Sequence, residues 1–281
     1  MKPNFYILII TLLLTGTLFS QMPLKRGSEL CSERKMSLPH TSLDHDSPNS
    51  PKHTFDVLDY KMNLDIRNCF ISPYPKSFTG SIIVKFRIDT ALNNINLNAV
   101  NTSLVISSVG LSGVSFTHTN NILNIVLNRT YNPGEVTEVL INYSHNNVSD
   151  GAFYTGNGGV FTDAEPEGAR KWFPCWDKPS DKATVDITLK VPANVKIGSN
   201  GRLNDSTLTG DTLYYHWVSR DPVTTYLTVL TGKVNYNLNI IYWPKISNPS
   251  DLVPIRFYYN SGENPTAMMN MFPNMITYFS Q

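Results

Sequence analysis

The stretch Gly158–Pro192 reads GGVFTDAEPEGARKWFPCWDKPSDKATVDITLKVP, and the rest of the chain is organised around it. Apolar and polar residues alternate from Ala183 to Val191, which predicts a half-buried strand closed by a proline. The preceding segment, 163–182, mixes acidic and basic side chains with the aromatic residues Trp172, Phe173 and Trp176. Long loops inside compact domains are uncommon unless they carry function. We interpret this segment as a loop that is pinned to a core and presents charged groups to a cleft; the alternative is a surface loop held by salt bridges.

Short alternating segments of the same kind recur from residue 53 onward, at a spacing of roughly ten residues. They cover residues 60–66, 82–88, 95–99, 104–106, 123–127, 139–143, 213–217, 226–230 and 253–259. Many short strands separated by turn signals are typical of antiparallel sandwiches. The pattern therefore predicts an all-β fold, either a β-sandwich or a saddle-like antiparallel double sheet.

The last segment of the chain changes to a helical period. Asn264 can cap a helix, and Pro265 suits its first position. Four large apolar residues would then share one face of the helix: Met268, Phe272, Met275 and Phe279. The sequence thus predicts one C-terminal helix, and we expect its apolar face to promote association wherever nothing covers it.

Residues 1–20 have the features of a secretory signal peptide. Lys2 precedes the apolar run Phe5–Leu14, and small residues after the run offer cleavage sites before Gln21. An uncleaved N-terminal anchor is the alternative. Residues 21–52 are polar, contain clustered proline and serine, and lack periodicity, which is typical of a linker. We therefore expect a secreted, periplasmic or cell-surface protein with no stable membrane span after cleavage.

The overall composition argues against a nucleic-acid partner. The 281 residues carry 23 basic and 22 acidic side chains, which gives a formal net charge of +1. A balance this close to zero supplies no electrostatic attraction to nucleic acid. The three cysteines, Cys31, Cys69 and Cys175, do not make a disulfide framework, and no C-x-x-C or Cys/His cluster is present.

The loop also carries a long and specific motif. It fits the pattern T-Q-x-E-x-x-x-A-R-x-x-F-P-C-x-D-x-P, followed by K-A and later by S-N. The matching residues are Thr162, Glu165, Ala169, Arg170, Phe173, Pro174, Cys175, Asp177, Pro179, Lys182, Ala183, Ser199 and Asn200. In this motif the chain resembles the aminopeptidase N family of zinc metallopeptidases, and it departs at Asp163, where the family has glutamine. The segment that begins at His53 also resembles the opening of that family, so the resemblance runs from there to the C-terminus.

The resemblance implies that residues 53–262 form the N-terminal β-domain of a zinc aminopeptidase and that residues 263–281 begin its catalytic domain. Peptidases of this type hold zinc with the two histidines of an H-E-x-x-H helix, whose glutamate is the general base. Neither that motif nor the family's G-x-M-E-N segment occurs in the chain. We therefore expect a fragment that binds no metal, contains no catalytic residue and is inactive alone. The full-length enzyme would use zinc and a downstream catalytic domain to act on peptides.

One substrate-binding position is retained, according to the resemblance. The family's motif glutamate reaches into the active site and helps to bind the α-ammonium group of the peptide, and that position is Glu165. A carboxylate suits an ammonium group, which offers three donors and needs charged acceptors. Asp163 lies beside it in sequence, where an acid would either strengthen ammonium binding or face solvent.

The other prominent residues of the loop are expected to be structural. Arg170 is predicted to form an ion pair with Asp177 or another acid of the loop. Cys175 is predicted to be a buried small apolar residue and not a nucleophile, because no histidine is near it in sequence. The three aromatic residues of the loop are predicted to anchor it in the core.

Two classes of function follow from the sequence. The first is the N-terminal domain of a secreted zinc aminopeptidase, which removes N-terminal residues from peptides; this domain would contribute recognition of the substrate's N-terminus. The alternative is a non-catalytic secreted β-sandwich module that binds a peptide, a glycan or a protein partner. An in-frame H-E-x-x-H beyond Gln281 in the genomic sequence would decide for the first class.

Overall fold

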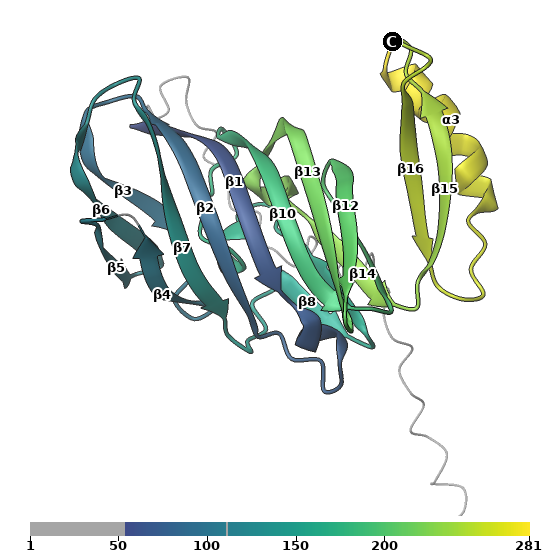
Figure 1. Ribbon diagram of the computed structural model, residues 1–281, viewed down its shortest axis with the longest axis horizontal. Helices are drawn as coiled ribbons and strands as arrows, with labels where there is room; N and C mark the ends of the chain where they lie inside the picture. Colours follow the sequence, from purple (N-terminus) through teal and green to yellow (C-terminus); the bar gives the residue numbers. More distant parts are fainter. Residues whose placement is uncertain (1–53, 111) are drawn as a thin grey trace, which may run out of the picture. The chain divides into compact units, whose positions relative to one another are not determined.

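The computed structural model describes residues 54–110 and 112–281 (Figure 1). Every described residue belongs to one compact unit, residues 52–281. The predicted signal peptide, 1–20, and the predicted polar lead-in, 21–52, lie outside the described residues. The boundary predicted near residue 262 stays a prediction.

The largest sheet has seven strands, and a parallel pair lies at its centre (Figure 1). The strand order is β12 (Arg202–Thr209), β13 (Thr212–Thr224), β10 (Lys182–Pro192), β1 (Phe55–Asp65), β2 (Phe78–Ile88), β7 (Val136–His145) and β4 (Leu104–Gly110). Strands β1 and β10 run parallel, with Asp59 opposite Thr184, and the other neighbours are antiparallel. The predicted strand of the organising stretch is therefore confirmed as β10.

Three smaller sheets complete the part of the chain that the structure describes. A four-stranded sheet has the order β11 (Val195–Ser199), β14 (Leu230–Val234), β9 (Gly159–Thr162) and β8 (Phe153–Gly156). A three-stranded sheet has the order β3 (Leu92–Asn98), β6 (Ile122–Tyr131) and β5 (Ser115–Thr119), and β15 (Asn237–Pro244) pairs with β16 (Leu252–Tyr259). Within residues 54–110 and 112–281 the helical elements are the 3-10 helices η1 (Arg67–Phe70), η2 (Ala169–Lys171) and η3 (Thr225–Leu227) and the α-helix α3 (Thr266–Phe279).

One hydrophobic core joins residues from the seven-stranded, four-stranded and three-stranded sheets. Alternate residues of β1 and β10, such as Met62 and Ile187, turn into this core, as the period of two along a strand requires. Trp172 and Phe173 of the organising loop complete it and are fully buried. The predicted all-β, largely antiparallel architecture is confirmed.

The strand predicted over residues 226–230 is wrong except at its last residue. The structure has the 3-10 helix η3 there, and β14 begins only at Leu230. Two contacts explain the difference. The hydroxyl of Thr225 donates to the buried carboxylate of Asp177, and the amide of Thr228 donates to the carbonyl of Thr225, which closes a turn. Alternating apolar residues cannot reveal a turn that a distant side chain imposes.

The predicted C-terminal helix is confirmed as α3. The predicted cap is wrong by one residue: Pro265 and not Asn264 is the N-cap, because the carbonyl of Pro265 accepts the first helical hydrogen bond from the amide of Met269. The side-chain oxygen of Asn264 accepts a hydrogen bond of 3.0 Å from the amide of Thr266, just before the helix. Members of the predicted apolar stripe remain exposed, including Met268 at 55% and Phe279 at 79%. No helix among residues 54–110 and 112–281 is long and apolar enough to cross a membrane.

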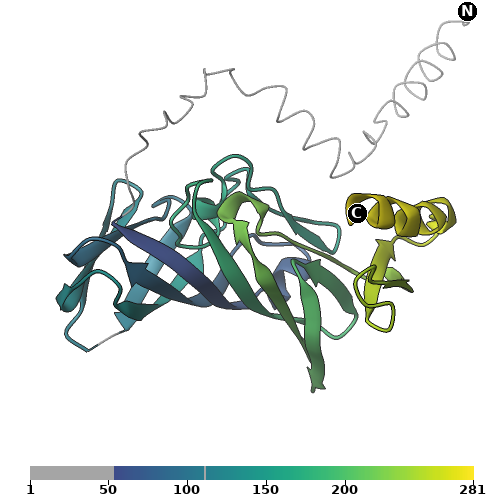
Figure 2. The same ribbon diagram turned by 90° about the horizontal axis from the view of Figure 1, so that it is seen from above.

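Helix α3 lies along the β15–β16 hairpin in both views (Figures 1 and 2). The rings of Phe257 and Phe272 meet edge to face, with centroids 5.4 Å apart. The indole nitrogen of Trp243 donates to the hydroxyl of Thr277 at 2.9 Å. The helix therefore packs on the hairpin through one side and leaves the rest of its predicted apolar stripe uncovered.

At Gly80 in β2, side chains of the core pack directly against the backbone. A Cβ atom there would lie 2.8 Å from Cδ2 of Leu64 and 3.0 Å from Cζ of Tyr143, and both side chains are buried. We expect Gly80→Ala to lower the free energy of unfolding by about 1–3 kcal/mol, because the extra methyl overpacks a dense core. Urea unfolding measures this. Gly110→Ala in β4 is the matched control, since its Cβ would come no closer than 3.5 Å to a neighbour; equal losses in the two variants would contradict the expectation.

Candidate functional site

Glu165, the predicted substrate-binding carboxylate, lies at the tip of a tight turn that follows β9. The amide of Gly168 closes this turn by donating to the carbonyl of Ala164 at 2.6 Å. A Cβ atom on residue 168 would lie 2.8 Å from Cα of Ala164, so the close approach requires glycine. The residue at the tip, Glu165, is exposed. The turn therefore carries its carboxylate away from the core.

Asp163 lies at the base of the same turn, where the backbone is fixed. Its amide donates to the carbonyl of Ala152 at 2.9 Å. The residue before it, Thr162, accepts a hydrogen bond of 3.0 Å from the amide of Leu230 on β14. The side chain of Asp163 is half-buried. The structure thus brings both predicted site residues to one turn, with Asp163 held against the sheet and Glu165 more exposed.

A buried hydrogen-bond network around Asp177 pins the far side of the loop. The Asp177 side chain is 1% exposed, and its Oδ2 accepts from Nε of Arg170 at 2.8 Å. Its Oδ1 accepts from the hydroxyl of Thr225 at 2.6 Å, and its amide donates to Oδ1 of Asn98 at 3.0 Å. The predicted structural ion pair of Arg170 is confirmed. Sequence patterns did not reveal the contributions of Asn98 and Thr225.

The exposed side of the loop is held by salt bridges. Glu167, whose side chain is 43% exposed, lies 3.1 Å from the guanidinium of Arg170 and 3.6 Å from the ammonium of Lys178. Exposed pairs of this kind contribute little to stability. The alternative interpretation, a loop held by surface salt bridges, therefore describes only this outer side, whereas the inner side has a buried anchor.

The aromatic residues and the cysteine of the loop are confirmed as parts of the core or its edge. The Trp172 and Phe173 rings pack at 4.5 Å between centroids, and Trp176 is half-buried with its ring against Phe55. Cys175 is fully buried, and it exchanges backbone hydrogen bonds with residue 98 of β3. Burial raises the pKa of the Cys175 thiol well above its ordinary value, which keeps the thiol neutral.

Asp181 ends the loop just before β10, and it is 3% exposed. Burial, and then the nearby carboxylate of Asp56 on β1, raise the pKa of Asp181 to about 7. The folded state therefore keeps a proton that the unfolded chain, with an aspartate pKa of about 4, releases. The domain consequently becomes less stable as the pH rises from about 4 to about 7, because the unfolded state loses its proton first.

This linkage gives a test with a defined sign. We expect the parent domain to lose stability between pH 5 and pH 8 by about 2–3 kcal/mol more than Asp181→Asn, which has no proton to release. Urea unfolding at the two pH values measures the difference. Asp205→Asn, at an exposed position on β12, is the matched control and should behave as the parent does. A parent and an Asp181→Asn variant with the same pH dependence would contradict the expectation.

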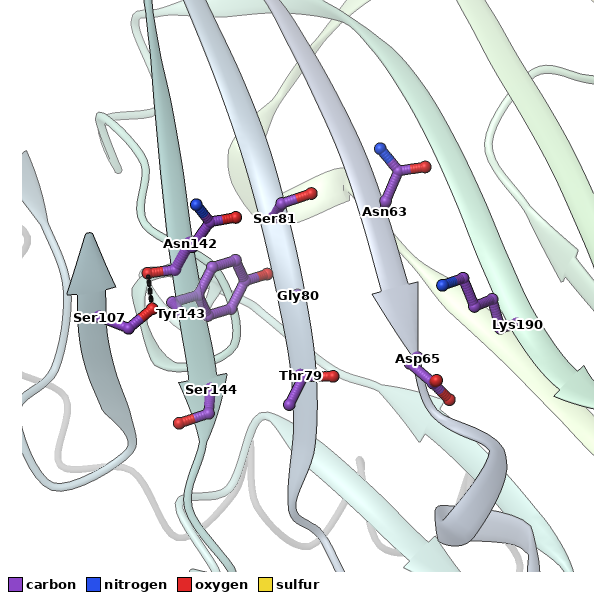
Figure 3. Close-up of a pocket in the computed structure, with 10 residues that line it drawn as sticks. All are labelled: Asn63, Asp65, Thr79, Gly80, Ser81, Ser107, Asn142, Tyr143, Ser144 and Lys190. Carbon is purple, nitrogen blue, oxygen red and sulfur yellow. Dashed lines mark hydrogen bonds between the residues drawn. The ribbon is translucent and has the colours of Figure 1, made fainter. Parts of the chain in front are cut away.

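A separate polar groove of about 500 Å³ lies on the seven-stranded sheet (Figure 3). Hydroxyl and amide side chains of β1, β2 and β7 line it, together with Asp65 and Lys190. The hydroxyl of Ser107 donates to the carbonyl of Asn142 across its edge at 2.9 Å. Neither Asp163 nor Glu165 lines this groove, so it is not part of the predicted substrate site.

The described residues do not fit a zinc ion. No group of three or more histidine, cysteine, aspartate or glutamate side chains in residues 54–110 and 112–281 is arranged to hold a metal. The histidines of this part of the chain have other partners. Nε2 of His118 lies 2.9 Å from the carbonyl oxygen of Ala99, and His145 and His216 each contact an aspartate.

The sequence matches the Peptidase M1 N-terminal domain family over residues 56–227. This chain belongs to that family. Among curated relatives, aminopeptidase M1 of Arabidopsis thaliana is 31% identical over 103 residues, which are 36% of this chain and 11% of the plant protein. Aminopeptidase M1-A of Oryza sativa subsp. japonica is 37% identical over 76 residues, 27% of this chain and 9% of the rice protein. The matched stretch is thus a small part of much longer aminopeptidases.

Solved structures share the fold of this M1 N-terminal domain. An M1 zinc metallopeptidase from Deinococcus radiodurans has a TM-score of 0.64 and 23% identity, covering 75% of this chain and 49% of that one. A mutant of that metallopeptidase bound to a Tyr-Ser-Ala substrate gives a TM-score of 0.63 with the same identity and coverage. The chain therefore spans about half the length of these relatives. The family resemblance of the loop motif is confirmed.

Proposed function

We propose that this M1 N-terminal domain belongs to a zinc aminopeptidase and supplies the carboxylate of Glu165 to the α-ammonium group of the peptide substrate. The observation that carries the proposal is the placement of Glu165. It is an exposed acid at the tip of a turn whose two sides are fixed, by the Asp177 network on one side and by β9 on the other. A carboxylate carried on a fixed backbone segment loses less conformational freedom when it meets a ligand, and this favours tight binding.

Asp163 would act in the same site as a second acceptor. It sits two residues before Glu165, and its backbone is held by Ala152. Two carboxylates near one ammonium group can share its three donors. In the proposed enzyme Asp163 therefore adds negative charge at the position where the family has glutamine.

Zinc in the proposed enzyme would be bound by residues outside this chain. The described residues do not form a metal site, and the sequence has no H-E-x-x-H. The chain would therefore bind and orient the substrate's N-terminus, while a catalytic domain outside it supplies the metal chemistry. The apolar run near the N-terminus supports a secreted, periplasmic or cell-surface location for this enzyme.

The experiment that tests the proposal compares two peptides that differ only at the N-terminus. The enzyme that contains this domain and its zinc domain should cleave a free-amine peptide, and chelation of the metal should abolish the cleavage. The N-acetylated peptide has no ammonium group and should be cleaved at least about a hundredfold more slowly in kcat/KM, since it cannot form the charged pair. Equal cleavage of the two peptides would contradict the proposal and favour an enzyme, or a binding module, that does not read the N-terminus.

A further inference from the structure

A buried histidine–aspartate pair lies in the core, close in the fold to the proposed site. Nε2 of His145, the last residue of β7, is 2.9 Å from Oδ2 of Asp150, and the two side chains are 0% and 6% exposed. The imidazole stacks on the ring of Phe78 with centroids 5.1 Å apart and also meets the ring of Phe153. Burial of a charged or polar pair requires good partners for every polar atom.

Both ring nitrogens of His145 face acceptors. Nδ1 lies 2.8 Å from the carbonyl oxygen of Lys76, which can only accept, so Nδ1 carries a proton. The opposite nitrogen faces the carboxylate of Asp150. Burial raises the pKa of Asp150, but hydrogen bonds from His145 and from the amides of Ala152 and Phe153 lower it overall. Asp150 is thus held at both oxygens, with Oδ2 against the imidazole and Oδ1 against the two amides.

A continuous chain of hydrogen bonds connects this pair with the proposed site. Oδ1 of Asp150 accepts from the amide of Ala152 at 2.9 Å and from the amide of Phe153 at 3.2 Å. The carbonyl of Ala152 then accepts from the amide of Asp163 at 2.9 Å. Phe153 also pairs with Thr162 across β8 and β9. The carboxylate of Asp150 thus fixes the strand against which the site turn begins.

The charged groups around the pair come from three segments. The ammonium group of Lys171 in η2 donates to the backbone carbonyl of Asp150 at 2.7 Å, which ties the organising loop to the same point. Asp65 at the end of β1 and Arg67 of η1 line a groove of about 430 Å³ together with His145, and they pair with each other at 2.7 Å. The faces of the imidazole meet the rings of Phe78 and Phe153.

We propose that His145 and Asp150 are positioning residues that hold the Asp163–Glu165 turn in place. Loss of the Asp150 carboxylate would free the amides of Ala152 and Phe153, and loss of the imidazole would release the carboxylate that holds them. Either change would loosen the turn, while the parallel pair of β1 and β10 stays intact. The inference rests on the proposed function only for what the turn binds; the positioning itself is a property of this domain.

The chain offers a matched control pair. Nε2 of His216 on β13 is 2.8 Å from Oδ1 of Asp186 on β10, nearly the same distance as in the buried pair. These side chains are 31% and 22% exposed, and the other ring nitrogen of His216 contacts the amide of Asn204 on β12. The contacts of this pair thus lie within three strands of the large sheet, β10, β12 and β13. The control therefore removes an imidazole–carboxylate contact without touching the turn.

The test is hydrogen–deuterium exchange of the full chain, read by mass spectrometry on peptides from 150–166 and from β1 and β10. Asp150→Ala removes the oxygen that accepts from the amides of Ala152 and Phe153, and His145→Gln removes the imidazole that contacts the other oxygen of this carboxylate. We expect both variants to exchange at least about tenfold faster over 150–166, with β1 and β10 unchanged, and we expect Asp186→Ala and His216→Gln to match the parent over 150–166.

Two outcomes would overturn the inference. The first is parental exchange over 150–166 in both Asp150→Ala and His145→Gln. The second is loss of protection throughout β1 and β10, which would make the pair a general stabiliser of the core. None of these measurements involves peptide binding, so a failed proposal for Glu165 would leave this inference standing, and the reverse also holds.

Discussion

Asp177→Ala is expected to lower the free energy of unfolding of the domain by about 3 kcal/mol or more. The substitution removes the buried partner of the Arg170 guanidinium and leaves the hydroxyl of Thr225 without its acceptor. Removal of one member of a buried ion pair is strongly destabilising, at about 3–5 kcal/mol, because the remaining charge stays desolvated. The side chain of Arg170 is 21% exposed, so water relieves part of this penalty and the lower end of the range applies. Urea unfolding followed by circular dichroism measures the loss.

Glu167→Ala is the matched control for Asp177→Ala, because it removes the other carboxylate that contacts Arg170. This pair is exposed, with 43% of the Glu167 side chain in solvent, and exposed pairs contribute about 1 kcal/mol or less. We therefore expect a small loss for Glu167→Ala. A loss for Asp177→Ala no greater than for the control would mean that the buried network does not hold the loop.

The strands of this domain were predictable where side chains alternate without interruption. Residues 183–191 alternate in this way, and β10 covers them in the structure. Trp172 and Phe173 were also predictable as core residues. Large aromatic side chains within a charged segment stabilise the fold when their apolar surface is buried. The ion pair between Arg170 and Asp177 followed from charge and proximity in sequence.

The sequence could not show contacts between residues that are far apart along the chain. Asp177 takes its remaining partners from Asn98 and Thr225, which lie 79 and 48 residues away. The second of these contacts is the reason that a 3-10 helix replaces the predicted strand near residue 226. The pair of His145 and Asp150 was equally hidden, although only five residues separate them, because burial and not spacing gives the pair its role.

Glu165→Gln is expected to lower kcat/KM for free-amine peptides by about a hundredfold in the proposed enzyme. Glutamine keeps the shape of the side chain and removes its charge, so the substitution isolates the electrostatic part of ammonium binding. Loss of one partner of a partly buried charged pair costs a few kcal/mol, and the resulting change in kcat/KM reports lost transition-state binding. The zinc content should stay unchanged, because Glu165 is not proposed as a ligand. N-acetylated peptides should be poor substrates for the parent and for the variant.

The most direct measurement is therefore kcat/KM for one free-amine peptide with the parent enzyme, Glu165→Gln and Glu167→Gln. The control removes the same charge two residues away on the same turn, from a side chain that contacts Arg170 and Lys178. We predict a fall of about a hundredfold for Glu165→Gln and a rate near the parental value for Glu167→Gln. Parental activity of Glu165→Gln, or an equal fall in both variants, would contradict a role for Glu165 in binding the substrate's N-terminus.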